Sequence, residues 1–567
     1  MRSTRLCTRI NIWPLPLLLP PSSSSHLPFS MAAQEPIPIY TSLDKLYSDL
    51  GNAATHAVRW NNLAEAFEKQ FGRKPAYIAR APGRVNLIGE HIDYALFGVL
   101  PAAIEPDILI ACAPQTTAIP SPGHVHAHNL QPQYKARSFA PMRRDSVSED
   151  HVHLKEWDLA INRRELHWES YVKAGYYGVL NRFFPLTEVA RSEIAPAPIP
   201  VDLLVTGTVP AGSGLSSSAA MVVASTLVFL AVNGKLDGVT KGTLTEMAME
   251  NEKRVGVNSG GMDQAASVIS TPASALYVSF FPKLSASPIP LPSHAVFILA
   301  NSLVMSEKAV HARTRYNLRV VETLAGARAL AHSLGVHVGP KERVTLREVV
   351  GRLGGEPEAG WDESEEGIAS LRDALGKALA GAEALKSGRP DEEGLTMDEM
   401  VARSGLGAAD FHEVYLSWID VEATYFQLHK RTKHVLSEAL RVLDFRAVCQ
   451  RAAADAAELV HETALKELGA LMDASMESCS TLCECSCPEL DLLARLAREA
   501  GAYGSRVTGA GWGGCTVSLV PEDRVEGFIT QLRATYPAYK DIGDEDIKEI
   551  VFATKPSSGA CVYEFTE

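Results

Sequence analysis

The sequence predicts a mixed fold of the α/β or α+β class with more than one domain. From Ile37 onward, short runs rich in β-branched residues alternate with segments of helical period, which is typical of these classes. A length of 567 residues exceeds that of one ordinary domain and indicates two to four. With 46% apolar and 21% charged residues, the chain has the composition of a globular protein rather than a disordered or coiled-coil one.

The N-terminal segment does not have the pattern of a packed domain. Residues 1–34 contain no Asp or Glu, and three arginines precede an apolar run, residues 12–21, that prolines interrupt. A secretory signal and an Arg-rich, Ser-rich transit peptide are alternative interpretations. We favour a translation start at Met31. Residues 1–36 are therefore expected to be a disordered leader or an alternative-start extension.

Two stretches of the chain predict helices. The longest apolar run outside the N-terminus, residues 219–232, is shorter than the roughly 20 residues that cross a bilayer, so it predicts a buried helix and no membrane association. Residues 421–475 have apolar positions three and four apart. This spacing predicts a helical layer in the second half of the protein.

A Pro-rich segment marks the expected domain boundary. Residues 287–293 precede a strand-like run over residues 295–300, and we place the boundary there. The predicted domains are residues 37–292 and 293–567. Within the second domain, residues 354–394 are rich in Gly and acidic residues, and we expect them to form a solvated surface insertion.

Charge and cysteine usage exclude some classes of function. The 54 basic and 67 acidic residues give a formal charge of −13, which argues against nucleic-acid binding because phosphate neutralisation needs clustered Lys and Arg. Nine cysteines, an odd number in a long chain, favour a reducing, cytoplasmic compartment. Cys479, Cys483, Cys485 and Cys487 could bind Zn²⁺ or an iron–sulfur cluster. Their spacing fits no standard template, and packing in the core is favoured.

The strongest functional pattern is the loop of residues 210–218, Pro-Ala-Gly-Ser-Gly-Leu-Ser-Ser-Ser, which leads into the apolar helix. Glycines let backbone N–H groups approach an anion closely, and serines can cap a helix whose positive dipole end faces that anion. The loop therefore predicts a phosphate cradle, with a turn that merely caps a core helix as the alternative. No Gly-x-x-x-x-Gly-Lys-Ser/Thr pattern occurs, which excludes a Walker-type site.

A second glycine-rich loop lies near the C-terminus. Its glycines have the Gly-x-Gly-x-x-Gly spacing of the dinucleotide-binding fingerprint, at Gly509, Gly511 and Gly514. That fingerprint requires a following helix, whereas residues 515–520 have the composition of a strand. We expect this loop to pack against the phosphates from the second domain. A tight hairpin turn is the alternative.

Polar side chains gather at the end of the segment spanning residues 83–94. Glu90, His91 and Asp93 lie within four positions. Carboxylates accept hydrogen bonds from hydroxyls and histidine can donate or accept, so this group suits a polyol. A metal site and a capped surface turn are alternatives. The His-Glu-x-x-His motif is absent, so zinc-protease chemistry has no support.

A third cluster contains two acidic residues eleven positions apart, Glu252 and Asp263. Near a phosphate loop, one carboxylate could bind Mg²⁺ while the other activates a hydroxyl nucleophile. Asp263 follows two glycines, where a helix cap is the commoner role.

Together the motifs resemble the galactokinase branch of the GHMP superfamily, which is named after galactokinase, homoserine kinase, mevalonate kinase and phosphomevalonate kinase. Residues 83–94 resemble the galactokinase signature, residues 210–220 the superfamily ATP loop and residues 504–514 its third motif. The resemblance extends from about residue 38 to the C-terminus. It implies an α+β fold that pairs a ribosomal-S5-like N-terminal domain with a ferredoxin-like C-terminal domain, with the active site between them.

The resemblance also implies ATP-dependent phosphorylation of the anomeric hydroxyl of galactose, giving α-galactose 1-phosphate. It assigns Asp263 as the catalytic base and Arg84 as the residue that keeps Asp263 ionised and stabilises developing charge. The sugar ligands it implies are Arg84, Glu90, His91, Asp93, Gly260, Asp263 and Tyr316. The ATP-binding residues it implies are Gly212, Gly214, Ser216, Ser217, Ser218 and Asn301. The Mg²⁺ ligands it implies are Ser218 and Glu252.

Two other functions are compatible with this resemblance. One is an N-acetylgalactosamine kinase, whose three motifs are closely similar. The other is a galactose- and ATP-sensing co-regulator that binds a repressor protein. Because this chain keeps the serine-rich loop, Glu252 and Asp263, catalysis is favoured. The expected partners are galactose and ATP, with a regulatory protein as a further partner, and the expected state is a monomer.

Overall fold

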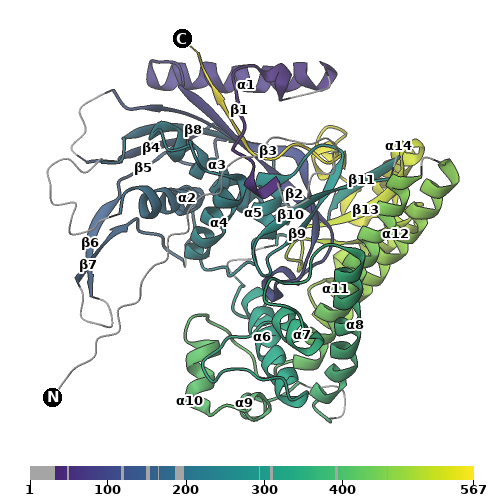
Figure 1. Cartoon of the computed structure of the whole chain (residues 1–567). Coiled ribbons are helices and arrows are strands. Elements are labelled where there is room, and N and C mark those ends of the chain that lie inside the picture. The colour runs from purple at the N-terminus through teal and green to yellow at the C-terminus, as the bar shows by residue number, and fades with distance from the viewer. Residues whose placement is uncertain are drawn as a thin grey trace, which may run out of the picture.

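The computed structural model contains a seven-stranded sheet, a four-stranded sheet and a layer of helices beside them (Figure 1). This agrees with the predicted α+β class. The residues that the structure describes are 32–46, 50–116, 121–147, 153–163, 165–185, 197–292, 294–306, 311–389, 394–455 and 457–566.

The seven-stranded sheet carries the first polar motif. Its centre consists of β2 (Tyr77–Ile88), β3 (Leu100–Pro114) and β8 (Val201–Gly207), joined as antiparallel neighbours. All three are largely apolar and buried on both faces, as expected for strands covered by helices on either side. The remaining strands are β1 (Ile39–Tyr40), β4 (Val125–Asn129), β5 (Arg137–Phe139) and β15 (Cys561–Glu564), in the order β1-β15-β2-β3-β8-β4-β5.

Helices cover both faces of this sheet. Helix α1 (Leu50–Phe71) contacts β3 and β8 on one face, while α3 (Ser217–Val232) and α5 (Met262–Ile269) contact β2 and β3 on the other. The predicted apolar helix is confirmed as α3, which is buried on all sides from Ala219 onward. Helices α2 (Trp168–Phe183) and α4 (Lys241–Glu252) pack against α3 in turn. Among the described helices, none is both long and apolar enough to span a membrane.

The four-stranded sheet has the antiparallel order β12-β13-β11-β14. The predicted strands over residues 295–300 and 515–520 are confirmed as β11 (Ala295–Asn301) and β13 (Cys515–Pro521). In β11, Val296 and Ile298 pack with α13 (Pro488–Glu499) and α14 (Val525–Thr535), whereas Phe297 and Leu299 join the main core, as the two-residue period of a strand requires. The outer strands are β12 (Gly504–Thr508) and β14 (Val551–Thr554). Two hairpins complete the strands: β6 (Met142–Val147) with β7 (His153–Asp158), and β9 (Ser274–Ser279) with β10 (Ser285–Pro290).

The predicted helical layer over residues 421–475 is confirmed as two long helices, α11 (Leu428–Ala454) and α12 (Glu458–Ser478). They are preceded by α6 (Tyr316–Ser333), α7 (Leu346–Gly354), α8 (Glu365–Gly381), α9 (Met397–Ser404) and α10 (Ala408–Phe411).

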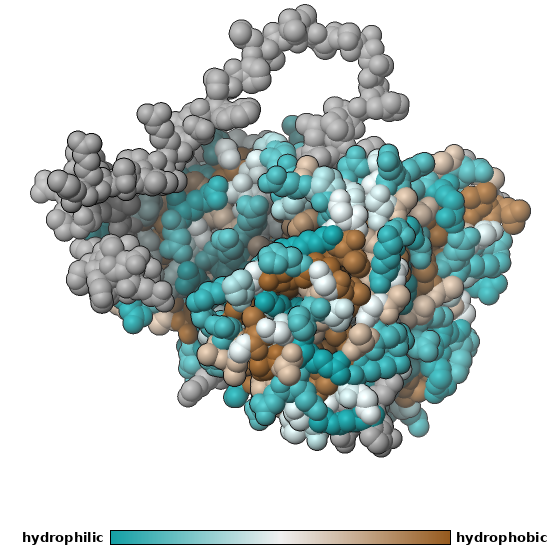
Figure 2. Space-filling view, turned by 60° about the horizontal axis from the view of Figure 1, so that its bottom comes forward, coloured by the Kyte–Doolittle hydropathy of each residue, from teal (hydrophilic) through white to brown (hydrophobic). Residues whose placement is uncertain are grey.

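On the face shown in Figure 2, hydrophobic residues form short patches that hydrophilic residues separate.

The expected solvated insertion at residues 354–394 needs correction. Its centre is α8, which contacts α7 and α11 through a buried apolar stripe that includes Leu371, Ala374 and Leu375. Its acidic residues also reach inward, since Glu363 accepts a hydrogen bond from Arg446 at 2.7 Å. Apolar residues spaced three and four apart outweigh the acidic composition here.

The start of the first predicted domain and the end of the second differ from the prediction. Residues 32–36 belong to the predicted leader, but Ala32 and Ala33 are buried, and the exposed Glu35 has its carboxylate 2.6 Å from Nζ of Lys241. Residues 1–31 lie outside the described residues. At the other end, β15 returns from the four-stranded sheet and pairs with β1 and β2. We retain the boundary near residue 292 as a proposal, with the last strand belonging to the first sheet.

Candidate active site

The serine-rich loop turns sharply into α3. Ser216 precedes the helix in the left-handed conformation, with φ at 60°, and Ser217 begins it. The buried Oγ of Ser216 has no hydrogen-bond partner among the described residues, and the first N–H groups of a helix lack intrahelical acceptors. An orphaned hydroxyl beside a helix N-terminus fits a phosphate oxygen, so the loop has the chemistry of the predicted cradle.

Arg84 links this loop to Asp263. Its Nη1 donates to the carbonyl oxygen of Gly214 at 2.6 Å, and its Nε and Nη2 lie 2.8 and 2.6 Å from Oδ1 of Asp263. The two side chains are only 3% and 9% exposed. Arg84 follows a β-bulge in β2, and Asp263 lies in the first turn of α5. The structure therefore brings together two residues that are 179 positions apart in the sequence.

The turn after β2 places His91 and Asp93 beside this ion pair. His91 has a positive φ of 58°, and its Nε2–H donates to the carbonyl oxygen of Ala510 at 2.9 Å. In the neutral imidazole, Nδ1 then accepts from the hydroxyl of Tyr94, 3.2 Å away. Asp93 accepts from the backbone N–H of Met262 at 3.4 Å. Both side chains are buried.

Tyr316, the first residue of α6, closes the group from the other domain. Its ring lies 5.2 Å from that of His91, and Arg84, Glu90, His91, Asp93, Asp263 and Tyr316 line one small space. Burial and the nearby Asp93 raise the pKa of Tyr316 well above its usual value. The hydroxyl consequently remains protonated and able to donate a hydrogen bond.

Gly260 packs against the backbone of the same turn. A Cβ atom on Gly260 would lie 2.4 Å from the carbonyl carbon of Asp93 and from the N atom of Tyr94, so any side chain would push the two segments apart. Sugar binding by Gly260 stays a prediction, and the position of Gly260 fixes how close α5 lies to the turn.

Buried charges from the second half of the chain hold the turn in place. Nη2 of Arg506, in β12, lies 2.9 Å from the carboxylate of Glu90, which also accepts from Asn86 at 3.1 Å. Arg506 is completely buried, and its Nη1 donates to the backbone oxygen of Asn86 at 2.9 Å. Burial raises the pKa of Glu90 to about 7, while Arg506 opposes that rise.

Glu438 of α11 holds the backbone of the turn. Its Oε1 accepts from the N–H of Gly89 at 2.9 Å and from the hydroxyl of Ser475 at 2.7 Å, and its Oε2 accepts from Arg441 at 2.7 Å. Burial opposes ionisation of Glu438. Arg441 and Arg506 nevertheless lower its pKa to about 2. Neither Glu438 nor Arg506 was predicted from the sequence. A charged residue on the apolar face of a predicted helix could have indicated Glu438.

We expect Glu438→Gln to destabilise the fold at neutral pH and to do so less in acid. A carboxylate whose pKa falls from about 4.5 unfolded to about 2 folded contributes about 3 kcal/mol above pH 4.5, and this contribution is lost as the pH falls toward 2. Urea unfolding of wild type and variant at pH 7 and pH 3.5 measures the difference. Glu477→Gln, at an exposed position on α12, is the matched control. A pH-independent difference for Glu438→Gln would contradict the prediction.

The proposed magnesium ligands lie on neighbouring helices. Ser218 is in the first turn of α3 and Glu252 ends α4, two helices that contact each other. Glu252 is buried and accepts a 2.5 Å hydrogen bond from Gln264, one residue beyond Asp263. A hydroxyl and a carboxylate are hard oxygen donors of the kind that Mg²⁺ prefers, so the residues fit the ion.

The second glycine-rich loop packs directly on the first. A Cβ atom on Gly509 would lie 2.2 Å from the carbonyl oxygen of Gly214, and only glycine allows this approach. Residues 302–306 then bridge the two loops: the N–H of Ser306 donates to Gly212 at 3.0 Å and its hydroxyl to Gly511 at 2.7 Å.

Asn301 takes a different position from the other predicted ATP-binding residues. It ends β11, where its side-chain oxygen accepts from the N–H of Leu303 at 2.9 Å. The structure thus uses Asn301 to shape the start of the bridging segment. A contact with the nucleotide stays a prediction.

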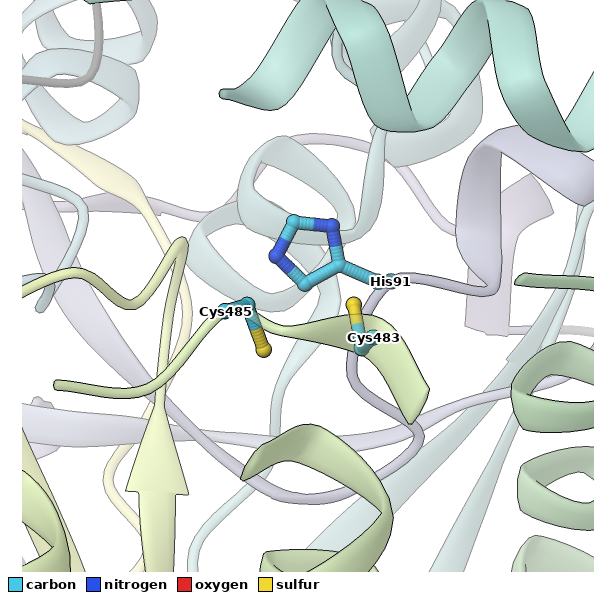
Figure 3. A group of neighbouring side chains, drawn as sticks. All are labelled: His91, Cys483 and Cys485. Carbon is cyan, nitrogen blue, oxygen red and sulfur yellow. The ribbon is translucent and has the colours of Figure 1, made fainter. Parts of the chain in front are cut away.

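The cysteine cluster lies behind His91. Ligand atoms of His91, Cys483 and Cys485 lie within 4.8 Å of one another, and Figure 3 shows the sulfur of Cys483 directed toward the imidazole and that of Cys485 directed away from it. Hydrogen bonds with Cys479 and Cys483, together with burial, raise the pKa of Cys485 well above its usual value, whereas zinc binds thiolates. The cluster packs against apolar residues of α13 and β12, which favours the core-packing interpretation.

Three family models match the chain. The galactokinase galactose-binding signature matches residues 65–114, the GHMP kinases N terminal domain residues 177–271 and the GHMP kinases C terminal model residues 456–538. The signature covers the turn that carries Glu90, His91 and Asp93.

Relatives match over most of their length. The chain is 34% identical over 543 residues to the galactokinase of Dictyostelium discoideum, covering 93% of this chain and 98% of that one. It is 36% identical over 526 residues to a galactokinase of Saccharomyces cerevisiae, covering 89% and 94%. The fold is similar to that of Lactococcus lactis galactokinase complexed with galactose, with a TM-score of 0.56 and 22% identity over 88% of this chain and 99% of that one. The chain therefore belongs to the galactokinase family and has the two-domain GHMP kinase fold that the motifs implied.

Proposed function

We propose that this protein transfers the γ-phosphoryl group of ATP to the anomeric hydroxyl of galactose, producing α-galactose 1-phosphate and ADP. The observation that carries the proposal is the position of Arg84, which binds both Asp263 and the carbonyl oxygen of Gly214. One cation thereby places a carboxylate next to the proposed phosphate loop and next to the buried polar group around His91.

In the proposed reaction, Asp263 accepts the proton of the anomeric hydroxyl while the hydroxyl oxygen forms a bond to the γ-phosphorus. The bond between that phosphorus and the β–γ bridging oxygen breaks, and ADP leaves with the bonding electrons. Arg84 assists both the proton transfer and the phosphoryl transfer. Its charge favours the ionised carboxylate of Asp263 and offsets negative charge on the transferred phosphoryl group.

The sugar hydroxyls would be bound by the buried group. The carboxylates of Glu90 and Asp93 accept hydrogen bonds and the protonated Tyr316 donates one. Because these side chains are buried, a sugar that leaves one of them unpaired would bind weakly. We therefore expect the site to recognise a specific pattern of hydroxyls rather than any hexose.

Mg²⁺ would be held by Ser218 and Glu252, where it would offset charge on the β- and γ-phosphates. We expect Glu252→Gln to raise the Mg²⁺ concentration for half-maximal activity by about tenfold or more, because a neutral amide is a poorer ligand than a carboxylate. Titration of activity with Mg²⁺ at saturating ATP and galactose measures this. Glu250→Gln, at an exposed position on the same helix, is the control, and an unchanged Mg²⁺ requirement in Glu252→Gln would contradict the assignment.

ADP release measured with galactose, and separately with N-acetylgalactosamine, tests the proposed function. We expect turnover with galactose and a kcat/KM at least tenfold lower with N-acetylgalactosamine. The relatives described above are galactokinases, which disfavours both the N-acetylgalactosamine kinase and the sensor. Folded protein that binds ATP and galactose without releasing ADP would support the sensor instead.

We also propose that the protein acts as a monomer in the cytoplasm. The eight described cysteines are all free, which supports a reducing compartment. Sedimentation velocity and cell fractionation test the two statements.

A further inference from the structure

A second cavity adjoins the proposed sugar site. It has a volume of about 560 Å³ and is lined by residues of α4, the turn between β9 and β10, α6 and the segment just before α7. These elements lie near the centre of Figure 1. Tyr94, Ser259 and Gly260 line it. Ser259 also lines the sugar site, so the two spaces share a wall. Its size is within the range of sites for small molecules.

The charged side chains of this cavity are mostly cationic. Lys253, Lys283 and Arg343 line it, against a single carboxylate, that of Glu246. Lys253 and Lys283 are exposed and form no ion pair with any residue that the structure describes. Arg343 stacks on the ring of Trp418, 4.0 Å from its centroid, and its Nε donates to the backbone oxygen of Val414 at 2.9 Å. The cations thus come from three separate segments and surround a space with no fixed counter-charge except Glu246.

The rest of the lining suits a polyhydroxy ligand. Asn258 and Ser259 offer an amide and a hydroxyl group, and Glu246 offers an acceptor for ligand hydroxyls. Thr245 and Thr345 also line the cavity, but their hydroxyls donate to Lys241 and Glu348. The remaining lining is apolar and suits the ring face of a sugar; it comes from Leu96, Met249, Phe280, Pro282, Leu284, Val320, Leu324 and Trp418. Unpaired cations suit a phosphate group, whereas neutral polar groups and one carboxylate suit the sugar that carries it.

We propose that this cavity is a second binding site for a sugar monophosphate, distinct from the site of phosphoryl transfer. The residues that form it come from both domains, so an occupant would hold α4 and α6 in a fixed relation. Its floor, residues 258–260, leads directly into α5, which carries Asp263. Occupancy of the cavity is therefore expected to alter turnover as well as to register as binding.

The product, α-galactose 1-phosphate, serves as the probe, a choice that rests on the proposed function. The catalytic site of the full-length protein is first filled with galactose, Mg²⁺ and a non-hydrolysable ATP analogue. Isothermal titration with α-galactose 1-phosphate is then expected to show one further equivalent bound. Inorganic phosphate and galactose 6-phosphate are titrated in parallel. Phosphate alone is expected to bind at least tenfold more weakly than either sugar phosphate.

The matched variants are Lys283→Glu, Lys283→Arg and Lys540→Glu. We expect Lys283→Glu to weaken the further equivalent by about tenfold or more, Lys283→Arg to retain it, and Lys540→Glu, at an exposed lysine outside the cavity, to leave it unchanged. Absence of a further equivalent, equal affinity in Lys283→Glu, or equally tight binding of inorganic phosphate would each overturn the inference. Turnover with galactose is measured on the same preparations, so loss of turnover in wild type counts against the proposed function and not against the second site.

Discussion

Asp263→Asn is expected to lower kcat by about 10³-fold or more while leaving the affinity for galactose within a few-fold of wild type. A positioned general base contributes roughly 10² to 10⁴ in rate, and an amide cannot accept the proton of the sugar hydroxyl. Asparagine keeps the volume and one acceptor oxygen of aspartate. Arg84 can therefore still donate to residue 263 and to the carbonyl oxygen of Gly214.

The measurement is ADP release under saturating galactose and ATP, together with galactose binding by isothermal titration. Asp202→Asn is the matched control. Asp202 is also buried and pairs with an arginine, Arg73, at 2.5 Å, but it lies on β8 and does not line the space around Asp263. Asp202→Asn is expected to lower stability and to leave kcat near wild type. Turnover near the wild-type rate in folded Asp263→Asn would show that another group takes the proton.

Much of the active site could be predicted because its residues sit in short local patterns. The turn containing Glu90, His91 and Asp93 and the loop containing Ser216 each occupy about a dozen consecutive residues, so their chemistry is visible without a fold. Local period and composition likewise predict the apolar helix α3 and the strand β13 after Gly514.

The supporting residues could not be predicted in the same way. Arg506 lies 416 positions from Glu90, and Glu438 lies 349 positions from Gly89, so only the folded chain shows that they meet. Composition alone also gives the wrong expectation for the segment around α8. There a buried stripe containing Leu371 and Leu375 outweighs the surrounding acidic residues, because burial of one helix face is sufficient to fix the segment.

Arg506→Met is expected to destabilise the protein by about 3 to 5 kcal/mol at pH 8. The variant leaves Glu90 buried without its cation, so this carboxyl group must either keep an uncompensated charge or take up a proton at pH 8. Breaking one side of a buried ion pair costs about this amount. Methionine preserves much of the volume of the side chain, so the effect reports the charge rather than a cavity. Arg495→Met is the control. Arg495 forms an exposed pair with Glu499 on α13 and is expected to contribute at most about 1 kcal/mol.

The pH dependence separates the loss of charge pairing from a loss of packing. Burial already raises the pKa of Glu90 to about 7 in the presence of Arg506, and removing the arginine raises it further. The folded variant then holds a proton that the unfolded chain releases above about pH 4.5, so its stability falls as the pH rises from 4.5 through 7 and beyond. Arg506→Met is therefore expected to be less destabilised, relative to wild type, at pH 5.5 than at pH 8.

A double-mutant cycle with Glu90→Gln completes the test. If the cost of Arg506→Met comes from the buried Glu90 carboxyl group that has lost its cation, adding Glu90→Gln removes that ionisable group, and the double variant is more stable at pH 8 than Arg506→Met alone. If the cost comes from the hydrogen bond between Arg506 and the backbone oxygen of Asn86, the second substitution brings no recovery and the pH dependence disappears. Either way the turn that presents His91 loses a support, so KM for galactose should rise in Arg506→Met. Only the charge-pairing explanation also predicts that the deficit in stability shrinks in acid.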